Sequence, residues 1–403
     1  MTRSIGWFAL ALVVACGGNE STPTTDTDTG TGAGPGTGTE TGGEAMGGSV
    51  LVRYDTADLG DDCMFGRYVS RLMAPSDDEV VAIGYETPCG HNDNIWLGRI
   101  AAADGALLAS FSHNGVQNFR DIGYDAAPTG DGRWAVVGTV DFQNSVPESG
   151  ATWFGVFAGD GTESPSVDLA GDARDLAVVP GGYVLVARAD PDATVVIGLD
   201  AAGAERWRTT REFSIPSGIT ADAAGNVYVA GVLSDQAPPG KHVALLFKVD
   251  PSGAIAWERT HDPEPSTDQA PSYFVDVALA PDGAIVVGGY ERRPEAVDTG
   301  LLLVHDPGGE QTALHRLPEG CRSVRAFAVD PGNGDFVTVC FDPDGMNVVM
   351  KFSPAGEERW RAALDTATPP STIAVAPNGA IWTTVARFTM EGELRDEIVG
   401  LVP

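Results

Sequence analysis

The feature that most constrains this chain is an internal repeat built from two alternating phrases. The first phrase, a polar turn followed by apolar residues at alternate positions, occurs seven times, most plainly as ADAAGNVYVAGV (221–232), APDGAIVVGGY (280–290) and APNGAIWTTV (376–385). The second phrase carries its turn glycine four residues before a tryptophan in three copies, IGLDAAGAERW (197–207), FKVDPSGAIAW (247–257) and MKFSPAGEERW (350–360). Each phrase places a turn rich in Gly, Asn and Asp between two strand-forming runs, which predicts two β-hairpins per repeat.

Two hairpins in a unit of about fifty residues make one four-stranded blade, so the predicted fold is an all-β, seven-bladed β-propeller over residues 49–403. The second phrase is complete only six times, and the chain stops at DEIVGLVP (396–403), which supplies a third strand for the seventh blade. We expect SVLVRYD (49–55) to add the fourth strand and close the ring, because an unpaired edge would otherwise remain. Rings of six or eight blades are alternatives, since the repeat lengths vary.

The paired phrases resemble the bacterial SBBP-type propeller repeats, and the Gly-x-x-x-Trp element at Gly203/Trp207, Gly253/Trp257 and Gly356/Trp360 resembles quinoprotein-like repeats. The resemblance spans about 49–403 and implies a propeller, a fold that hosts many unrelated functions. The sequence has no vicinal Cys-Cys pair of the kind many quinoprotein dehydrogenases carry, and we predict no organic cofactor. The repeated tryptophans are expected to pack between blades rather than to form a sugar-binding platform.

The N-terminus has the pattern of an export signal. Arg3 is followed by an apolar run from Ile5 to Ala15, which has the length of a signal-peptide core and is too short to span a bilayer. The ending Val13-Val14-Ala15-Cys16 resembles the bacterial lipobox, which implies a lipoprotein signal peptide over residues 1–15 and lipidation of Cys16. An ordinary secretory signal cleaved nearby is the alternative.

Residues 16–48 contain the lipidated cysteine and a linker of Gly, Thr, Ser, Pro and acidic residues, which is too poor in apolar side chains to fold. A monomer held in the cell envelope by this anchor is therefore expected, at the outer membrane and facing either the periplasm or the surface. Its first partner would be the lipid bilayer. The formal net charge of −31 makes nucleic acid an unfavourable partner.

Four further cysteines suggest two disulfides in an exported chain. Cys63 and Cys89 bracket one inner hairpin, and Cys321 and Cys340 bracket another, so we predict the pairs Cys63–Cys89 and Cys321–Cys340. Metal binding by these cysteines is the weaker alternative, because no C-x-x-C pair is present.

Three aspartates open the first strand of a blade, the strand that lines the central channel of a propeller. Asp121, Asp175 and Asp276 could therefore converge, and converging carboxylates suit a hard cation such as Ca²⁺. The alternative is structural: Arg120 and Arg174 precede two of these aspartates and could neutralise them.

The sequence favours a binding or scaffolding function, in which the propeller presents a face to an envelope protein or a glycan. The alternative is an extracytoplasmic propeller enzyme, a polysaccharide hydrolase or lyase. No catalytic residue is predicted, because the six histidines show no metal-ligand spacing and no G-x-S-x-G or P-loop motif is present.

Overall fold

The computed structural model describes the chain within residues 50–403. Short stretches inside this range are not described, namely 56–63, 89–91, 118, 143–150, 160–162, 164–166, 170, 190–191, 235–241, 264–270, 293–297, 342–346, 367, 369 and 389–393. The predicted signal peptide, Cys16 and the linker lie outside the described residues, so these remain predictions from the sequence.

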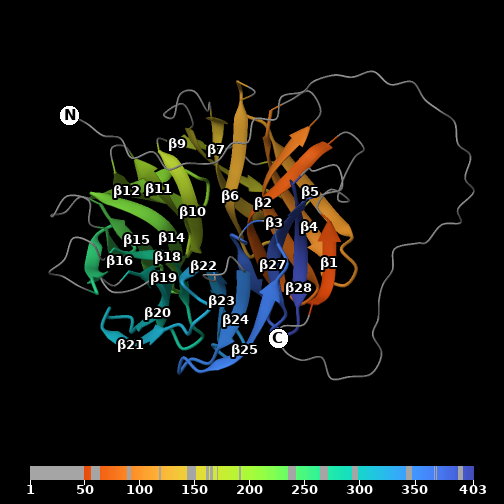
Figure 1. The fold of residues 1–403 in the computed structure, drawn as a ribbon. Coiled ribbons are helices and arrows are strands. Elements are labelled where there is room, and N and C mark those ends of the chain that lie inside the picture. The colour runs from red at the N-terminus through yellow and green to blue at the C-terminus, as the bar shows by residue number, and fades with distance from the viewer. Residues whose placement is uncertain are drawn as a thin grey trace, which may run out of the picture. The chain divides into compact units, whose positions relative to one another are not determined.

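The described residues form seven four-stranded antiparallel sheets arranged as the blades of a propeller (Figure 1). From the inner to the outer strand, blades 1 to 3 are β2 (Met64–Ser76), β3 (Glu79–Pro88), β4 (Asn94–Ala101), β5 (Leu107–His113); β6 (Arg120–Pro128), β7 (Trp134–Phe142), β8 (Ala151–Phe157), β9 (Val167–Leu169); and β10 (Asp172–Val179), β11 (Gly182–Ala189), β12 (Ala193–Asp200), β13 (Glu205–Glu212). Blades 4 and 5 are β14 (Ser214–Ala221), β15 (Val227–Leu233), β16 (Val243–Val249), β17 (Ile255–His261); and β18 (Ser272–Leu279), β19 (Ile285–Glu291), β20 (Thr299–His305), β21 (Gln311–Arg316). Blades 6 and 7 are β22 (Ser323–Val329), β23 (Phe336–Phe341), β24 (Asn347–Phe352), β25 (Glu358–Leu364); and β26 (Ile373–Val375), β27 (Ile381–Phe388), β28 (Leu394–Leu401), β1 (Val50–Asp55).

This architecture confirms the predicted all-β propeller and its blade number of seven. Among the described residues, no helix is long and apolar enough to cross a membrane.

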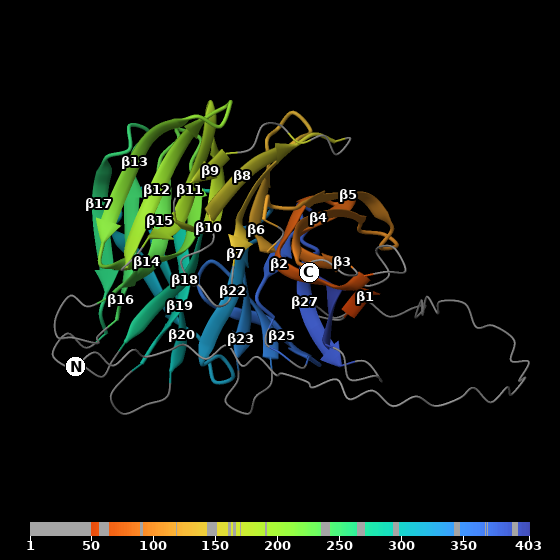
Figure 2. The same cartoon turned by 90° about the horizontal axis from the view of Figure 1, so that it is seen from above.

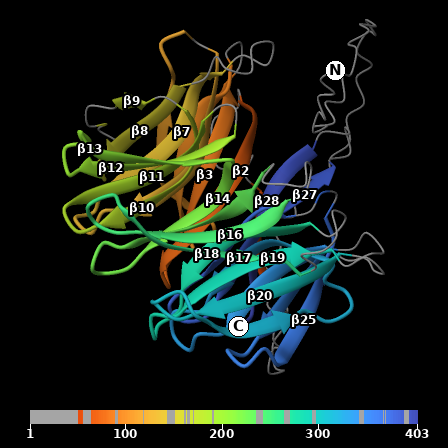
Figure 3. The same ribbon diagram turned by 90° about the vertical axis from the view of Figure 1, so that its left-hand side faces the viewer.

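The core consists of seven apolar layers, each lying between two adjacent blades. The layer between blades 3 and 4, for example, contains Val186, Val229 and Phe247. Each of the two middle strands of a blade contributes to the layers on both of its faces, which explains their nearly continuous apolar sequences, such as GYVLVARA in β11. Figure 3 shows blades 3, 4 and 5 following one another from the side. No blade has a core of its own, so the stability of each depends on both neighbours.

The second repeated phrase forms the turn of the outer hairpin and packs against the preceding blade. In blade 4, the Asp250 carboxylate accepts hydrogen bonds from the amides of Ser252 (2.8 Å) and Ala254 (3.1 Å). Gly253 has φ of 91°, a conformation that favours glycine, and a Cβ there would lie 2.8 Å from the Trp207 ring of blade 3. Gly253 of blade 4 and Trp207 of blade 3 therefore meet between the two blades, which confirms the predicted packing role of Trp207.

The N-terminal strand closes the ring as predicted. β1 pairs antiparallel with β28, placing Val50 opposite Leu401 and Tyr54 opposite Ile398. Red-orange β1 lies beside blue β28 in Figure 1, and from above blue β27 lies next to the orange strands of blade 1 (Figure 2). The last blade is thus built from both ends of the described chain.

Tyr54 makes β1 a bridge to blade 1. Its ring stacks on Trp382 with centroids 6.1 Å apart, and its hydroxyl donates a 2.7 Å hydrogen bond to the carbonyl of Ala102. A Cβ on Gly105, at φ of 74° in the outer turn of blade 1, would lie 2.1 Å from the Tyr54 ring. Tyr54 thus takes the place at the blade 7–blade 1 junction that Trp207 takes at the blade 3–blade 4 junction.

The disulfide Cys321–Cys340 is present, and both half-cystines are buried. It links the segment before β22 to the paired strand β23, as predicted from the hairpin that the two cysteines bracket. Cys63 and Cys89 lie outside the described residues, so their pairing stays a prediction.

Deleting residues 50–55 is expected to cause a large loss of stability and aggregation, because it exposes the edge of β28 and removes Tyr54 from the blade 7–blade 1 layer. Tyr54→Ala, which keeps the strand, is expected to lower the free energy of unfolding by roughly 2 kcal/mol, somewhat less than a fully buried aromatic would cost. Thermal and urea unfolding measure both effects.

The matched control is deletion of residues 17–46, which removes a longer segment but none of the contacts above. It is expected to leave the melting temperature nearly unchanged. Equal destabilisation by the two deletions would contradict closure of the ring through β1.

Candidate functional site: the central channel

The inner strands share one irregularity that shapes the channel. The pairing register of the inner strand with its neighbour shifts at an equivalent place in each of blades 1 to 6, as a β-bulge does. We call the residue after this shift in each blade, together with Thr372 just before β26, the bulge ring. Its members are Arg71, Asp125, Asp175, Gly218, Asp276, Ala326 and Thr372.

Polar members of the bulge ring connect neighbouring blades. The amide of Leu176 in blade 3 donates to Asp125 of blade 2 (3.2 Å), and the amide of Ile219 in blade 4 donates to Asp175 of blade 3 (2.9 Å). The amide of Leu72 in blade 1 donates to the Thr372 hydroxyl of blade 7 (2.8 Å). Thr372 thus makes the same contact as the two aspartates, which supports its place in the ring.

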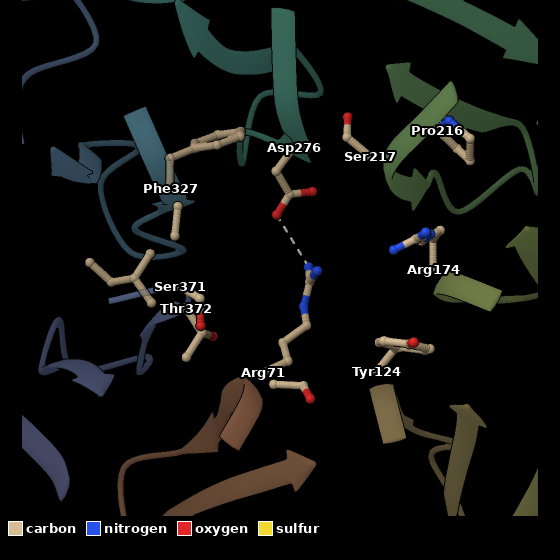
Figure 4. A pocket seen from close by; sticks show the side chains of 12 residues that line it. Arg71, Tyr124, Arg174, Pro216, Ser217, Asp276, Phe327, Ser371 and Thr372 are labelled. Atoms are coloured by element: carbon tan, nitrogen blue, oxygen red, sulfur yellow. Dashed lines mark ion pairs between the residues drawn. The ribbon is translucent and has the colours of Figure 1, made fainter. Parts of the chain in front are cut away.

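Arg71 holds the centre of the bulge ring. Its Nε lies 3.1 Å from Asp125, and its two terminal nitrogens lie 3.3 Å from Asp175 and 3.4 Å from Asp276. Figure 4 shows the Arg71 side chain reaching from blade 1 towards Asp276 of blade 5. One guanidinium therefore joins carboxylates from three other blades, and each of its nitrogens faces a different one.

The small residue at position 218 makes this arrangement possible. A Cβ on Gly218 would lie 2.1 Å from Oδ1 of Asp276. Any side chain in that place would displace the Asp276 carboxylate from the channel. The glycine is therefore required by the close approach of a neighbouring blade.

Three carboxylates around one guanidinium leave an excess of negative charge. Burial, opposed by Arg71 and assisted by the Asp175 carboxylate, raises the pKa of Asp276 to about 6. Burial and the nearby Asp175 carboxylate also raise the pKa of Asp125 well above its usual range. Burial acts to lower the pKa of Arg71, but the carboxylates of Asp175, Asp125 and Asp276 outweigh it and raise the pKa.

A pocket of about 280 Å³ opens beside Arg71, and every blade contributes to its wall from its inner strand or the residues just before it. Its lining is mainly polar, with Ser70, Ser217, Ser371 and Thr372 supplying hydroxyl groups (Figure 4). None of the described histidines lines it. The pocket therefore presents hydroxyl groups together with Arg71, Arg174 and Asp276, whereas Asp125 and Asp175 are buried beside Arg71 and do not line it.

The structure brings together only two of the three aspartates predicted to bind calcium. Asp175 and Asp276 both face Arg71, whereas Asp121 lies four residues before Asp125 in β6, roughly 13 Å away along the strand. The buried Asp121 carboxylate accepts hydrogen bonds from the amides of Gly115 (2.5 Å) and Asp141 (2.7 Å).

Asp121 thus fastens the loop after β5 to the end of β7. The described part of the chain contains no group of three or more His, Cys, Asp or Glu residues placed to hold a metal ion. Calcium binding in the channel remains a prediction of the sequence alone.

The alternative prediction, that Arg120 and Arg174 neutralise the aspartates that follow them in sequence, is wrong. Arg120 pairs with Asp93 (2.5 Å), and Arg174 pairs with Asp172 (2.6 Å), so neither neutralises the aspartate that follows it in sequence. Successive strand residues point to opposite faces, which sends each arginine away from its neighbour. The cation that neutralises the channel aspartates is Arg71.

Sequence reasoning missed Arg71 and Asp125, although a signal for both was present. Except for Gly218, which is followed by Ile219 and Thr220, each bulge-ring residue directly precedes a short apolar pair, as in SRLMA, RDLAV, VDVAL and RAFAV. Aligning the inner strands on this pair, rather than on aspartates at the strand starts, places Arg71 and Asp125 in register with Asp175 and Asp276.

Arg71→Met is expected to lower the free energy of unfolding at pH 7 by about 3 kcal/mol, because it leaves buried carboxylates without their cation. The loss should shrink at pH 4.5, where protonation removes the uncompensated charge. Urea unfolding at both pH values measures the difference.

Arg174→Met serves as the control for Arg71→Met, since Arg174 also lines the pocket but pairs with a single carboxylate, Asp172, and this pair is partly exposed. It should cost less than about 1 kcal/mol. Equal losses in the two variants would contradict the central role of Arg71.

The titration of Asp276 should make the stability of the protein depend on pH. Its pKa of about 6 in the folded state exceeds the value of about 3.9 expected for an unfolded chain. The folded state therefore holds the proton more tightly, and the contribution of this group to stability declines as the pH rises from about 4 to about 6. Asp276→Asn should remove this decline, so wild type loses stability relative to the variant between pH 4.5 and pH 7. Parallel urea-unfolding profiles across this range would contradict the prediction.

Comparison with known proteins supports the fold and leaves the family open. No protein-family model and no curated protein matches the sequence. Among solved structures, a chain from "Crystal Structure of Mitotic Checkpoint Complex" aligns with a TM-score of 0.58 and 11% identity, covering 96% of this chain and 99% of that one. The WD40 β-propeller domain of Doa1 aligns with a TM-score of 0.51 and 12% identity, covering 87% of this chain and 96% of that domain. These similarities are to propellers, and the resemblance to SBBP-type or quinoprotein-like repeats stays a prediction.

Proposed function

We propose that this protein is a binding or scaffolding module that is tethered in the cell envelope and holds a protein partner at its central channel. The observation that carries the proposal is the channel pocket, to which all seven blades contribute. A site built from every blade exists only in the assembled ring. A propeller suits such a role because a rigid ring fixes the position of the side chains around its channel.

The chemistry of the pocket favours a partner that inserts a cationic group. Asp276 lines the pocket, and the buried Asp125 and Asp175 lie beside Arg71. When all three are ionised, they carry three negative charges against the one positive charge of Arg71. Arg174, the other cation in the wall, is paired with Asp172. A lysine or arginine side chain, or a chain amine, would gain from this excess charge, and the strongly negative protein would attract a basic partner from a distance.

A glycan is the alternative ligand suggested by the sequence. A neutral sugar could hydrogen-bond to the serine hydroxyls, but it would gain nothing from the charge of the carboxylates around Arg71. The tether is supported by the sequence alone, through the signal-like segment that ends at Cys16. One of the similar solved propellers comes, by its title, from a multiprotein complex, which is in keeping with a protein partner.

Photo-cross-linking in intact cells tests the proposal. A photoreactive amino acid at Ser371 in the pocket should give one discrete protein adduct, which Asp276→Asn should weaken because it removes part of the negative charge. The control position is Leu108, which is 55% exposed on the outer strand of blade 1, and it should not give this adduct. Cys16→Ser should shift the protein from the membrane fraction to the soluble fraction.

An adduct that forms from Leu108 but not from Ser371 would overturn the channel as the binding site. Release of sugar fragments from envelope polysaccharide by the purified protein would favour the enzyme alternative, provided that Ser371→Trp, which obstructs the pocket, abolishes it.

A further inference from the structure

A second pocket, of about 360 Å³, lies between blades 5 and 6 and shares no lining residue with the channel pocket. Val286, Val304 and Ala313 form part of its wall on blade 5, and Phe336 and Pro354 form part of its wall on blade 6. Its size falls within the range of about 300–1,000 Å³ typical of small-molecule sites. A comparison of equivalent positions in the other blades explains why this pocket is open.

The strand registers of blades 4 and 5 show which large side chains of blade 4 are absent from blade 5. In blade 4, Tyr228 pairs with Lys248, which pairs with Trp257, and the outer register shifts directly after Lys248. In blade 5, Val286 pairs with Val304, which pairs with Ala313, and the shift directly follows Val304. Three large side chains of blade 4 are therefore replaced in blade 5 by two valines and an alanine.

Blades 1, 3 and 6 each have a large side chain at one of these three paired positions. Trp207 occupies the position of Ala313 in blade 3, and Trp360 occupies it in blade 6. Blade 1 has Ala109 there, but the paired Arg99 lies alongside and forms two hydrogen bonds, of 2.6 and 2.7 Å, to Glu79. Among these blades, only blade 5 lacks both the tryptophan and a long neighbouring side chain.

Trp257 shows what this position holds when it is occupied. Its indole packs in the apolar layer between blades 4 and 5, with its centroid 6.1 Å from that of Tyr228. A Cβ on the turn residue Gly309 of blade 5 would lie 2.9 Å from the ring. At the next junction, the His315 ring takes the place of the indole over the equivalent turn residue, Gly356, and the space beside Ala313, Val304 and Phe336 stays open.

We propose that the pocket between blades 5 and 6 binds a free small molecule that carries a planar aromatic group of about the size of indole. Phe336, Pro354 and the two valines offer apolar walls for the ring, in the place where the repeat elsewhere buries its own tryptophan. The exposed carboxylate of Asp282 also lines the pocket, so a neutral or cationic substituent is accepted and an anionic one is repelled. This site is independent of the function proposed for the channel.

Isothermal titration of the purified protein with indole, tryptamine and indole-3-acetate tests the site. Indole and tryptamine should bind saturably with one equivalent, and indole-3-acetate at least several-fold more weakly. Ala313→Trp should reduce indole affinity at least tenfold while leaving the melting temperature equal to or above that of wild type, because the new side chain fills the pocket. The control is Ala256→Trp, which adds a tryptophan to an exposed position on the outer strand of blade 4 and should leave binding unchanged. The absence of saturable indole binding to wild type, or equal affinity in wild type and a folded Ala313→Trp variant, would overturn the proposal.

A reciprocal variant tests the structural reasoning without relying on Ala313. In blade 3 the residues beside Trp207 are Val184 and Gly198, both small, so Trp207→Ala should open a comparable pocket between blades 3 and 4. Indole should then bind with a second equivalent and raise the melting temperature of this variant more than that of wild type. A stoichiometry of one with no additional thermal shift would refute the identification of the pocket as a vacant indole position.

Discussion

The structure depends on closure of the ring, because every apolar layer lies between two blades and none lies within one. A blade at an open end would expose one full apolar face together with an unpaired strand edge. The chain meets this constraint by splitting the last blade between its two ends, so that β1 pairs with β28. Tyr54 then packs on the next blade as the repeated tryptophan does elsewhere. Closure is therefore a matter of both backbone pairing and side-chain packing.

Ring closure also creates the channel and brings three carboxylates close together in it. Bulges in the inner strands place three aspartates close together, and their mutual repulsion would be costly in a buried site. Arg71 offsets this repulsion by offering each carboxylate a different nitrogen, while its own side chain stays one-third exposed. Burial, assisted by the Asp175 carboxylate, still raises the pKa values of Asp276 and Asp125. The preference for cations that we propose for the channel rests on this cluster.

Two small residues in the repeat, Gly218 and Ala313, have structural consequences. Gly218 has no side chain where the Asp276 carboxylate needs room, and Ala313 stands where three other blades have a tryptophan. The first exception completes an ionic cluster, and the second leaves a cavity. The ionic cluster at the channel and the cavity between two blades therefore each depend on a small residue.

The sequence by itself determined the elements of the fold. The alternating phrases predicted the hairpins, the count of phrases predicted seven blades, and the unpartnered SVLVRYD segment predicted the closing strand. These are consequences of local chemistry: turn residues at hairpin bends, apolar alternation along strands, and the cost of an open edge. The Cys321–Cys340 pair followed in the same way, because its partners flank one hairpin.

Only the tertiary structure decided which side chains meet in the channel. Asp121 and Asp125 lie in the same strand, which has two register shifts, and Asp125, not Asp121, joins Asp175 and Asp276 around Arg71. Arg71 is far from these residues in sequence, so its contacts with three other blades exist only once the ring has formed. The open space at Ala313 was likewise identified only by comparing the strand registers of blades 4 and 5. A pattern along the chain fixes the period of each strand, but the register between strands and the closure of the ring decide what each side chain faces.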